Sequence, residues 1–427
     1  MKIEQLYDIY LEHSSVKTDT RHLQQGDLFF ALKGPNFNGN TFAGKALEAG
    51  ASFVIIDEAA YRQDERTILV DNALSTLQQL ALFHRKQFNI PFLAITGSNG
   101  KTTTKELIHQ VLSTSLKTYT TKGNLNNHIG IPLTILAVKK DAEIAVIEMG
   151  ANHQKEIEAY CTYTLPTHGI ITNAGKAHLE GFGGVEGVKK GKGELYDFIR
   201  EHRGTVFVMW DYDYLRTMSS GISSIIRYGI LEGDVTGRII ESNPFLQVEI
   251  TKGADTGIIR TRLVGEYNLP NVLAAVCVGK YFNVPDAQIK KACEAYNPSN
   301  SRSQLIEKDS NQIIMDAYNA NPSSMRSAIE NFAQLTSGQK VVMLGAMAEL
   351  GSDSLEEHKE LVRLIEKYSW KNVVLVGGDF AKVPHSYIYF NNALEAKEWY
   401  RQQHFTNTTV LVKGSRSMQM EEVLNRN

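Results

Sequence analysis

The segment Ala94-Ile-Thr-Gly-Ser-Asn-Gly-Lys-Thr-Thr-Thr104 decides the fold of this chain. It ends the apolar run Pro91–Thr96 and opens a helical pattern that extends from Thr102 to about Leu116. A strand that enters a helix through a Gly-rich turn presents backbone N–H groups to an anion. The order of strand, Gly-rich turn and helix therefore predicts a phosphate-binding loop in a parallel α/β sheet. Ile95 stands where the longer P-loop motif has its first glycine, so this is the shorter TGxxGKTT form.

The loop itself predicts ATP binding. Lys101 is expected to reach the outer phosphates and the Thr102 hydroxyl to ligand Mg²⁺. A chance Gly-rich turn is the alternative, and the order of strand, turn, Gly-Lys-Thr and helix argues against it. The residues expected to contact the nucleotide here are Thr96, Gly97, Ser98, Asn99, Gly100, Lys101, Thr102 and Thr103.

Length and composition set the wider frame. The 427 residues predict two or three domains, and 42% hydrophobic content suffices for several cores. The net charge of −2 argues against a general nucleic-acid binder. No apolar stretch approaches the ~20 residues of a membrane helix. The charged N-terminus is unlike a secretory signal, and the three cysteines are far apart, so we expect a cytoplasmic protein. We also expect a monomer.

The apolar runs predict an α/β protein of three domains. Residues 1–88 read as a small α/β unit with a strand at Ser52–Ile56 and a helix from about Ser75 to Phe88. Residues 89–297 read as a mostly parallel sheet, which becomes more β-like after Gly204. Residues 298–427 read as a Rossmann-like domain. Its expected strands are Gln312–Met315, Lys340–Leu344, Val373–Val376 and Thr409–Val412, and a helix is expected at Ser354–Tyr368.

Three residues outside the loop are candidates for chemistry. Glu148 ends the run Glu143–Glu148, and a carboxylate at the end of a parallel strand lies where ligands bind; the alternative is a solvated acid. His178 follows the apolar run Gly169–Thr172 and is either a metal ligand or a structural histidine. Lys192 lies in a lysine cluster that is solvated or binds phosphate, since an ammonium group cannot ligand a metal.

Seven further motifs are long and specific: TDTRHLQQGDLFFALKG (18–34), GNLNNHIGIPLT (123–134), IEMGANHQKEI (147–157), TNAGKAHLEGFGG (172–184), GVKKGKGELY (187–196), DAYNANPSSM (316–325) and LVKGSR (411–416). Together with the loop they resemble the Mur ligase family, which builds the peptide of bacterial cell-wall precursors. The resemblance covers nearly the whole chain. It implies a uridine-nucleotide domain, a central ATPase domain and a C-terminal domain that completes the ATP site. The implied activity is ATP-dependent addition of D-Ala-D-Ala to UDP-N-acetylmuramoyl-tripeptide.

The same resemblance implies roles for individual residues. Lys101, His178, Lys192 and Arg302 would be catalytic, and Lys192 would be carbamylated by CO₂. Two Mg²⁺ ions would be bound by Thr102, Glu148, His178 and the carbamate of Lys192. The nucleotide-binding site would be completed by Asn268 and Asn271, which would contact adenine, by Asp316 at the ribose and by Arg302 at the γ-phosphate. Because the loop and Arg302 lie in different blocks, closure of the two domains would assemble the site.

Substrate contacts follow in the same way. The resemblance implies Thr20 and Arg21 for the UDP-sugar, Asn126, Asn127 and His128 for the peptide or sugar, and Asn319, Asn321, Lys413 and Ser415 for the dipeptide. For each of these the alternative is local hydrogen bonding in a turn.

Three positions depart from the family pattern. Tyr267 replaces a histidine before the first asparagine of NxxN and Ala346 replaces an acid; in the third place, Asn38 and Asn40 replace the Asp and His of FDGH. Two other functions stay open from the sequence. One is a sibling ligase with a different acceptor, such as the enzyme that adds the third residue or folylpolyglutamate synthase. The other is an ATP-binding protein without ligase activity.

Overall fold

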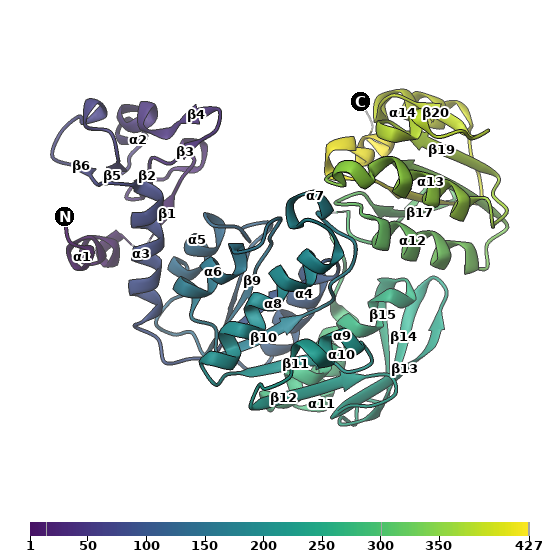
Figure 1. The fold of residues 1–427 in the computed structure, drawn as a ribbon, viewed down its shortest axis with the longest axis horizontal. Helices are drawn as coiled ribbons and strands as arrows, with labels where there is room; N and C mark the ends of the chain where they lie inside the picture. The colour runs from purple at the N-terminus through teal and green to yellow at the C-terminus, as the bar shows by residue number, and fades with distance from the viewer. Residues whose placement is uncertain (14, 300, 426–427) are drawn as a thin grey trace.

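The computed structural model describes residues 1–13, 15–299 and 301–425. It contains three separate main sheets, one after another along the chain, with a helical layer on each. Figure 1 shows them as three units in chain order, with the N-terminus in the first and the C-terminus in the third. The predicted three-domain α/β fold is therefore confirmed.

The first sheet is small and wholly parallel, in the order β1-β2-β5-β6. A short hairpin, β3–β4, lies beside it. One face of the sheet packs on α2 and the other on α1 and α3. The bounds of these elements are α1 Ile3–His13, β1 Val16–Lys17, β2 Leu28–Phe30, β3 Lys33–Gly34, β4 Phe37–Asn38, α2 Ala43–Glu48, β5 Phe53–Ile56, β6 Thr67–Leu69 and α3 Ala73–Arg85.

A buried joint fixes this first unit to the second. Arg85, at the end of α3, is 6% exposed, and its Nε donates to the main-chain oxygen of Thr164 at 2.8 Å. His84 Nε2 lies 2.9 Å from the main-chain oxygen of Val138, and the Tyr10 hydroxyl donates to that of Leu136. Burial lowers the pKa of Arg85 to about 10. Because the partners are main-chain groups of a packed domain, this joint is stiff.

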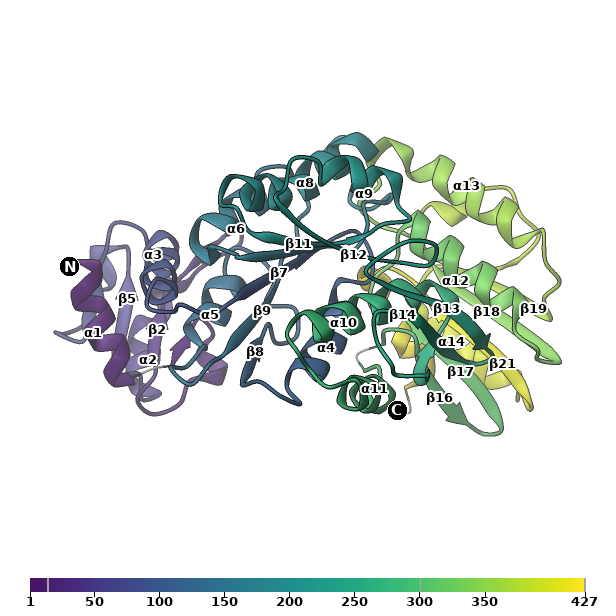
Figure 2. The ribbon, with the colours of Figure 1, turned by 90° about the horizontal axis from the view of Figure 1, so that it is seen from below.

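The central sheet has nine strands in the order β15-β14-β13-β12-β11-β10-β7-β9-β8. Strands β7 to β13 pair in parallel, and the pairs β13–β14 and β14–β15 are antiparallel. Figure 2 shows α6, α8 and α9 on one side and α4, α10 and α11 on the other, which explains why β7 and β9 are apolar on both faces. The strands are β7 Phe92–Thr96, β8 Thr118–Thr120, β9 Ile144–Glu148, β10 His168–Ile171, β11 Thr205–Met209, β12 Ser224–Gly229, β13 Val235–Ser242, β14 Phe245–Lys252 and β15 Ile258–Val264. The helices are α4 Lys101–Leu112, α5 Gly130–Leu136, α6 Glu156–Thr164, α7 Leu179–Phe182, α8 Val185–Glu201, α9 Asp213–Met218, α10 Leu269–Tyr281 and α11 Asp286–Ala295.

The third sheet has the order β16-β17-β21-β18-β19-β20, parallel except for β16 at one edge. Its elements are β16 Gln304–Lys308, β17 Asn311–Asp316, α12 Pro322–Gln334, β18 Gln339–Gly345, α13 Ser354–Ile365, β19 Asn372–Val376, β20 Ile388–Phe390, α14 Ala393–Gln402 and β21 Thr408–Lys413. In the part of the chain that the structure describes, no helix has the length and apolar character needed to cross a membrane.

Helix α4 is shorter than predicted, ending at Leu112 rather than near Leu116. The reason lies in the following Ser-Thr-Ser. The Thr114 hydroxyl donates to the main-chain oxygen of Val111 at 2.7 Å, and Ser113 Oγ lies 3.0 Å from His109 Nδ1. Such side chains compete with the helix for its own backbone groups.

His168 is expected to make the central domain sensitive to acid. Its ring is packed among Phe207, Tyr281 and Phe282, and burial lowers its pKa from 6.5 to about 4. The unfolded chain therefore binds the proton more readily. The stabilisation is complete above pH 6.5 and is lost as the pH falls towards 4, with a slope of at most about 1.4 kcal/mol per pH unit.

Denaturant unfolding followed between pH 7 and 4 tests this expectation. His168→Phe should lose less stability than the wild type over that range, whereas His22→Phe, at an exposed position, should follow the wild type. Equal slopes for His168→Phe and the wild type would contradict the assignment.

Candidate active site

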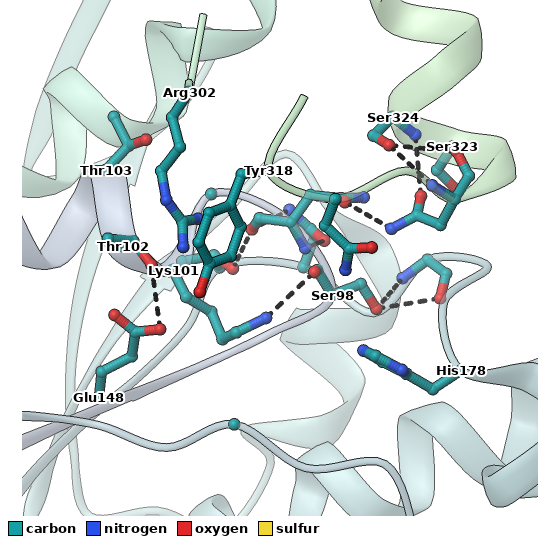
Figure 3. Close-up of a pocket in the computed structure, with 18 of the residues that line it drawn as sticks. Ser98, Lys101, Thr102, Thr103, Glu148, His178, Arg302, Tyr318, Ser323 and Ser324 are labelled. Atoms are coloured by element: carbon teal, nitrogen blue, oxygen red, sulfur yellow. Dashed lines mark hydrogen bonds between the residues drawn. The ribbon is translucent and has the colours of Figure 1, made fainter. Parts of the chain in front are cut away.

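A cavity of about 820 Å³ lies between the second and third domains. Most of the site residues expected from the sequence line it, as the close-up in Figure 3 shows for several of them. These are Ser98, Asn99, Gly100, Lys101, Thr102, Thr103, Asn126, Asn127, His128, Glu148, His178, Asn268, Asn271, Arg302, Asp316, Asn319, Asn321 and Lys413.

The loop at the β7–α4 junction depends on its two glycines. Gly97 has φ +145° and Gly100 has φ +78°. A Cβ at Gly97 would lie 2.0 Å from Thr172 Oγ1, and one at Gly100 would lie 2.7 Å from Asn271 Oδ1. Asn173, after β10, holds the loop at Asn99, accepting from its N–H at 2.9 Å and donating to its oxygen at 3.0 Å. The loop shape is thus fixed before any anion binds.

Lys101 is a cation held against this loop. Its Nζ donates to the main-chain oxygens of Gly97 at 2.7 Å and Ser98 at 3.2 Å. Burial lowers the pKa of Lys101 to about 8, the charge of Arg302 acts in the same direction, and the Glu148 carboxylate opposes both. An incoming phosphate would supply the negative charge that this buried ammonium group lacks.

Glu148 carries a carboxylate oxygen that suits a metal ion. The residue is 1% exposed, and its Oε1 accepts from Thr102 Oγ1 at 3.0 Å and from Asn126 Nδ2 at 2.8 Å. Its buried Oε2 has no hydrogen-bond partner among residues 1–13, 15–299 and 301–425. An unpaired buried carboxylate oxygen is costly, so the Thr102–Glu148 pair fits Mg²⁺.

The described residues contain no group of three or more His, Cys, Asp or Glu side chains that could hold a metal ion. Magnesium is commonly bound through one or two carboxylates together with substrate phosphates, and it keeps several water ligands.

Lys192 lies just behind the cavity, on α8. It is 1% exposed, its Nζ donates to the main-chain oxygen of Ala151 at 3.0 Å, and the same atom lies 4.9 Å from the centroid of the Phe182 ring. Burial, and then the charge of Lys101, hold the pKa of Lys192 well below its usual range. A neutral amine is the form that can react with CO₂.

The third domain contributes Arg302 in a fixed orientation. Its guanidinium carbon lies 3.5 Å from the centroid of the Tyr318 ring. The neighbours Ser301 and Ser303 both have a left-handed backbone, with φ of +56° and +51°. Asp316 Oδ1 accepts from the N–H of Ser303 at 3.2 Å. Two strained residues around one arginine indicate that the segment is shaped to aim it.

Asp316 and Lys413 form an ion pair that the sequence did not predict. Lys413 Nζ lies 2.6 Å from Asp316 Oδ2 and donates to the main-chain oxygen of Asn319 at 3.3 Å. Lys413 is 1% exposed, so its charge is already partly compensated.

The NxxN pair lies against the loop. Asn271 Nδ2 donates to Asn268 Oδ1 at 2.8 Å, and Thr104 Oγ1 donates to Asn271 Oδ1 at 3.0 Å. Tyr267, the departure from the family pattern, has its hydroxyl 3.0 Å from Ser303 Oγ. It therefore links the second domain to the segment that carries Arg302.

His178 is contacted from the third domain. Its Nδ1 pairs with Glu349, and both residues have a left-handed backbone, with φ of +51° and +60°. The imidazole holds the pKa of the Glu349 carboxyl below its usual range. In the view of Figure 3, Lys101 lies between Glu148 and His178. Asn321 Nδ2 also crosses between the domains, donating to Asn99 Oδ1 at 2.8 Å.

Six expected residues do not line the cavity: Thr20, Arg21, Thr96, Gly97, Lys192 and Ser415. Thr20 and Arg21 form a single turn in the first domain, where Arg21 pairs with Asp19. Ser415 is buried and donates to the main-chain oxygen of Ala346 at 2.6 Å. In this structure its hydroxyl stabilises the backbone.

Sequence reasoning missed Asn173, Tyr318 and Glu349. Asn173 and Tyr318 lie inside the quoted motifs TNAGKAHLEGFGG and DAYNANPSSM, so their position beside expected residues was an available signal. Glu349 lies in Leu344–Gly351, the stretch in which Ala346 departs from the family pattern, but its contact with His178 had no local signal because the two residues are 171 positions apart.

This geometry defines a P-loop enzyme that assembles its phosphate site from two domains. Comparison with known families identifies which one. The family described as Mur ligase middle domain matches residues 95–279, the Mur ligase glutamate ligase domain matches residues 301–416, and the Mur ligase family catalytic domain matches residues 12–85. The chain belongs to the Mur ligase family.

Full-length relatives agree. The UDP-N-acetylmuramoyl-tripeptide–D-alanyl-D-alanine ligase of Bacillus subtilis (strain 168) is 34% identical, covering 96% of this chain and 92% of the relative. That of Escherichia coli (strain K12) is 33% identical, covering 98% and 94%. The crystal structure of MurF from Acinetobacter baumannii superposes with a TM-score of 0.86 at 32% identity, covering 96% of this chain and 92% of that one. MurF ligase from Thermotoga maritima, in complex with ADP, gives 0.85 at 26% identity and covers 97% of each chain.

Proposed function

We propose that this chain joins D-Ala-D-Ala to UDP-N-acetylmuramoyl-tripeptide at the expense of ATP, and so makes the pentapeptide precursor of peptidoglycan. The observation that carries the proposal is the single cavity into which the loop, Glu148 and Arg302 converge from two domains. The names of the full-length relatives supply the substrates.

The reaction has two steps. A carboxylate oxygen of the tripeptide attacks the γ-phosphorus of ATP, the bond to the β-phosphate oxygen breaks, and an acyl phosphate and ADP form. The amine of D-Ala-D-Ala then attacks the acyl carbon, the C–O bond to phosphate breaks, and the amine loses a proton. Both reactants of the first step are anions, so Lys101 and Arg302 offset their repulsion and hold them in line.

Thr102 would hold a first Mg²⁺ beside the phosphates, Glu148 and His178 would be Mg²⁺ ligands, and a carbamate on Lys192 would position a second ion. When bound, the metal ions neutralise charge on the phosphates. The buried surroundings favour the neutral form of the Lys192 amine. In this form the amine would attack CO₂ and lose a proton to give the carbamate.

The remaining residues take the binding roles expected from the sequence. Asn268 and Asn271 would contact adenine and Asp316 ribose. Thr20 and Arg21 would bind the UDP end, and Asn126, Asn127 and His128 would lie along the peptide. Asn319, Asn321 and Lys413, which line the cavity, would receive the dipeptide, and Ser415, whose hydroxyl donates to the main-chain oxygen of Ala346, would shape the backbone beside them. We also propose domain bounds at 1–88, 89–297 and 298–427, a cytoplasmic location and a monomer.

Phosphate release tests the function directly. It is measured with ATP and Mg²⁺ in the presence of UDP-N-acetylmuramoyl-tripeptide, with and without D-Ala-D-Ala, and the product is weighed by mass spectrometry. Dependence on both substrates and a pentapeptide product are expected. Turnover only with a single amino acid, or with a folate, would assign a sibling activity instead. Nucleotide binding without turnover, even after bicarbonate is added, would favour a non-catalytic protein.

The stack between Arg302 and Tyr318 predicts a graded mutational effect. Tyr318→Ala should lower kcat/KM for ATP about tenfold, because a cation–π contact of this kind is worth about 1–2 kcal/mol. Tyr318→Phe keeps the ring and should stay near the wild type. Steady-state kinetics at varied ATP check both variants, and equal loss in the two would show that the hydroxyl, not the stack, matters.

A further inference from the structure

Glu349 is the third-domain residue that contacts the proposed metal ligand His178. It lies on the loop after β18, and its carboxylate pairs with His178 Nδ1. A second contact holds the same two loops together, since the main-chain oxygen of Glu349 accepts from the N–H of Glu180 at 3.4 Å. Gly351 lets the loops approach, because a Cβ there would lie 3.2 Å from Glu180 Cβ.

Both partners adopt a backbone that their side chains disfavour. His178 has φ +51° and Glu349 has φ +60°, in the left-handed region where residues with a Cβ are uncommon. Such conformations persist only where the surroundings impose them, and they concentrate at functional sites. Here two of them meet across a domain boundary. Their side chains are 17% and 50% exposed, so the histidine is the buried partner.

The contact also bears on which ring nitrogen can bind a metal. The Glu349 carboxylate lies against Nδ1 as an ion pair without a hydrogen bond to that atom within the described residues, so Nε2 is the nitrogen left to act as a ligand. Histidines that bind metals usually have their other nitrogen tied to a carboxylate or carbonyl, which fixes the ring and raises its basicity. In this protein the tying carboxylate belongs to another domain.

We infer that Glu349 is a positioning residue that orients His178 for metal binding only when the third domain is docked. This rests on the proposed function, in which His178 is a metal ligand. Because linkage is reciprocal, metal bound with nucleotide must favour the docked arrangement to the same extent as docking favours the metal. The metal affinity and the extent of domain closure then report the same coupling free energy between metal binding and docking.

The test is a titration of full-length protein with Mn²⁺ in the presence of ADP, followed by electron paramagnetic resonance. Glu349→Gly removes the carboxylate and also relieves the left-handed strain, so it should fold well, with a melting temperature at or above that of the wild type. Its Mn²⁺ affinity should fall about 10–100-fold, the usual cost of losing such a partner. Glu349→Gln keeps an acceptor oxygen and should recover most of the affinity.

Glu357→Ala is the matched control. Glu357 pairs with Lys176 across the same boundary but does not touch His178. This variant should keep wild-type Mn²⁺ affinity. Small-angle X-ray scattering of the same samples should show that Mn²⁺ with ADP compacts the wild type and Glu357→Ala more than Glu349→Gly.

Two results would overturn the inference. One is wild-type Mn²⁺ affinity in Glu349→Gly, and the other is an equal loss in Glu349→Gly and Glu357→Ala. His178→Asn separates this from failure of the proposed metal site, since asparagine tolerates a left-handed backbone. If His178→Asn binds Mn²⁺ like the wild type, the ligand role of His178 is wrong; if it binds weakly while Glu349→Gly does not, only the positioning role is wrong.

Discussion

Replacing Lys101 with methionine should reduce kcat/KM for ATP by about a thousandfold or more, as losses of preorganised charge at phosphoryl-transfer sites typically do. Lys101 is the cation supplied by the loop itself, and burial lowers its pKa to about 8. Without a bound anion, the positive charge of such an ammonium group is only partly balanced. Its attraction to the phosphates is strongest when negative charge accumulates on them. Its contribution should therefore appear mainly in kcat.

The same variant should not harm the fold. Removing a partly buried cation whose partners are two main-chain oxygens should leave the melting temperature of the nucleotide-free protein close to that of the wild type or higher. Lys122→Met, at an exposed position on the segment after β8, is the control and should keep wild-type kinetics. Phosphate release at varied ATP and a thermal melt of each variant measure both expectations. Activity of Lys101→Met within tenfold of the wild type would refute the role assigned to this ammonium group.

Lys192→Ala should lose activity by a similar factor, and the loss should depend on CO₂. If the carbamate forms, wild-type enzyme prepared without CO₂ is weakly active and regains activity when bicarbonate is added. Lys192→Glu places a permanent carboxylate near the same point and should recover part of the activity without responding to bicarbonate. Lys190→Ala, two positions away and exposed, should behave like the wild type.

Nuclear magnetic resonance with isotopically labelled bicarbonate provides a readout that does not depend on turnover. A carbamate signal is expected in the wild type and in Lys190→Ala, and none in Lys192→Ala. A fully active wild type that shows no signal and no response to bicarbonate would mean that the buried amine itself does the work.

The sequence was most informative where a function needs neighbouring residues. The loop at 94–104 lies on one strand–helix junction, so its glycines, Lys101 and Thr102 could be read locally, and the end of β9 placed Glu148 beside it. The three-sheet architecture followed from strands that are apolar on both faces because helices cover them.

The features of the site that the sequence did not predict depend on contacts between distant segments. The Lys413–Asp316 pair joins residues 97 positions apart, and the His178–Glu349 contact crosses two domains. Neither leaves a periodic pattern in the sequence. The early end of α4 has a different cause, since the hydroxyl of Thr114 bonds to the main-chain oxygen of Val111 and competes with a helical pattern that continued in the apolar residues.

The joint at His84 and Arg85 makes the two domain boundaries of this protein different in kind. The first and second domains meet through buried side chains bonded to main-chain oxygens, whereas the second and third meet through side chains at the rim of a cavity. Under the proposed function, a substrate bound by the first domain would reach the phosphate loop across this joint of buried hydrogen bonds. If this joint keeps its geometry, the length of the peptide would decide whether its carboxylate reaches the phosphate loop. A stem peptide one residue too short leaves its carboxylate out of reach of ATP, even though every group that handles the chemistry is in place.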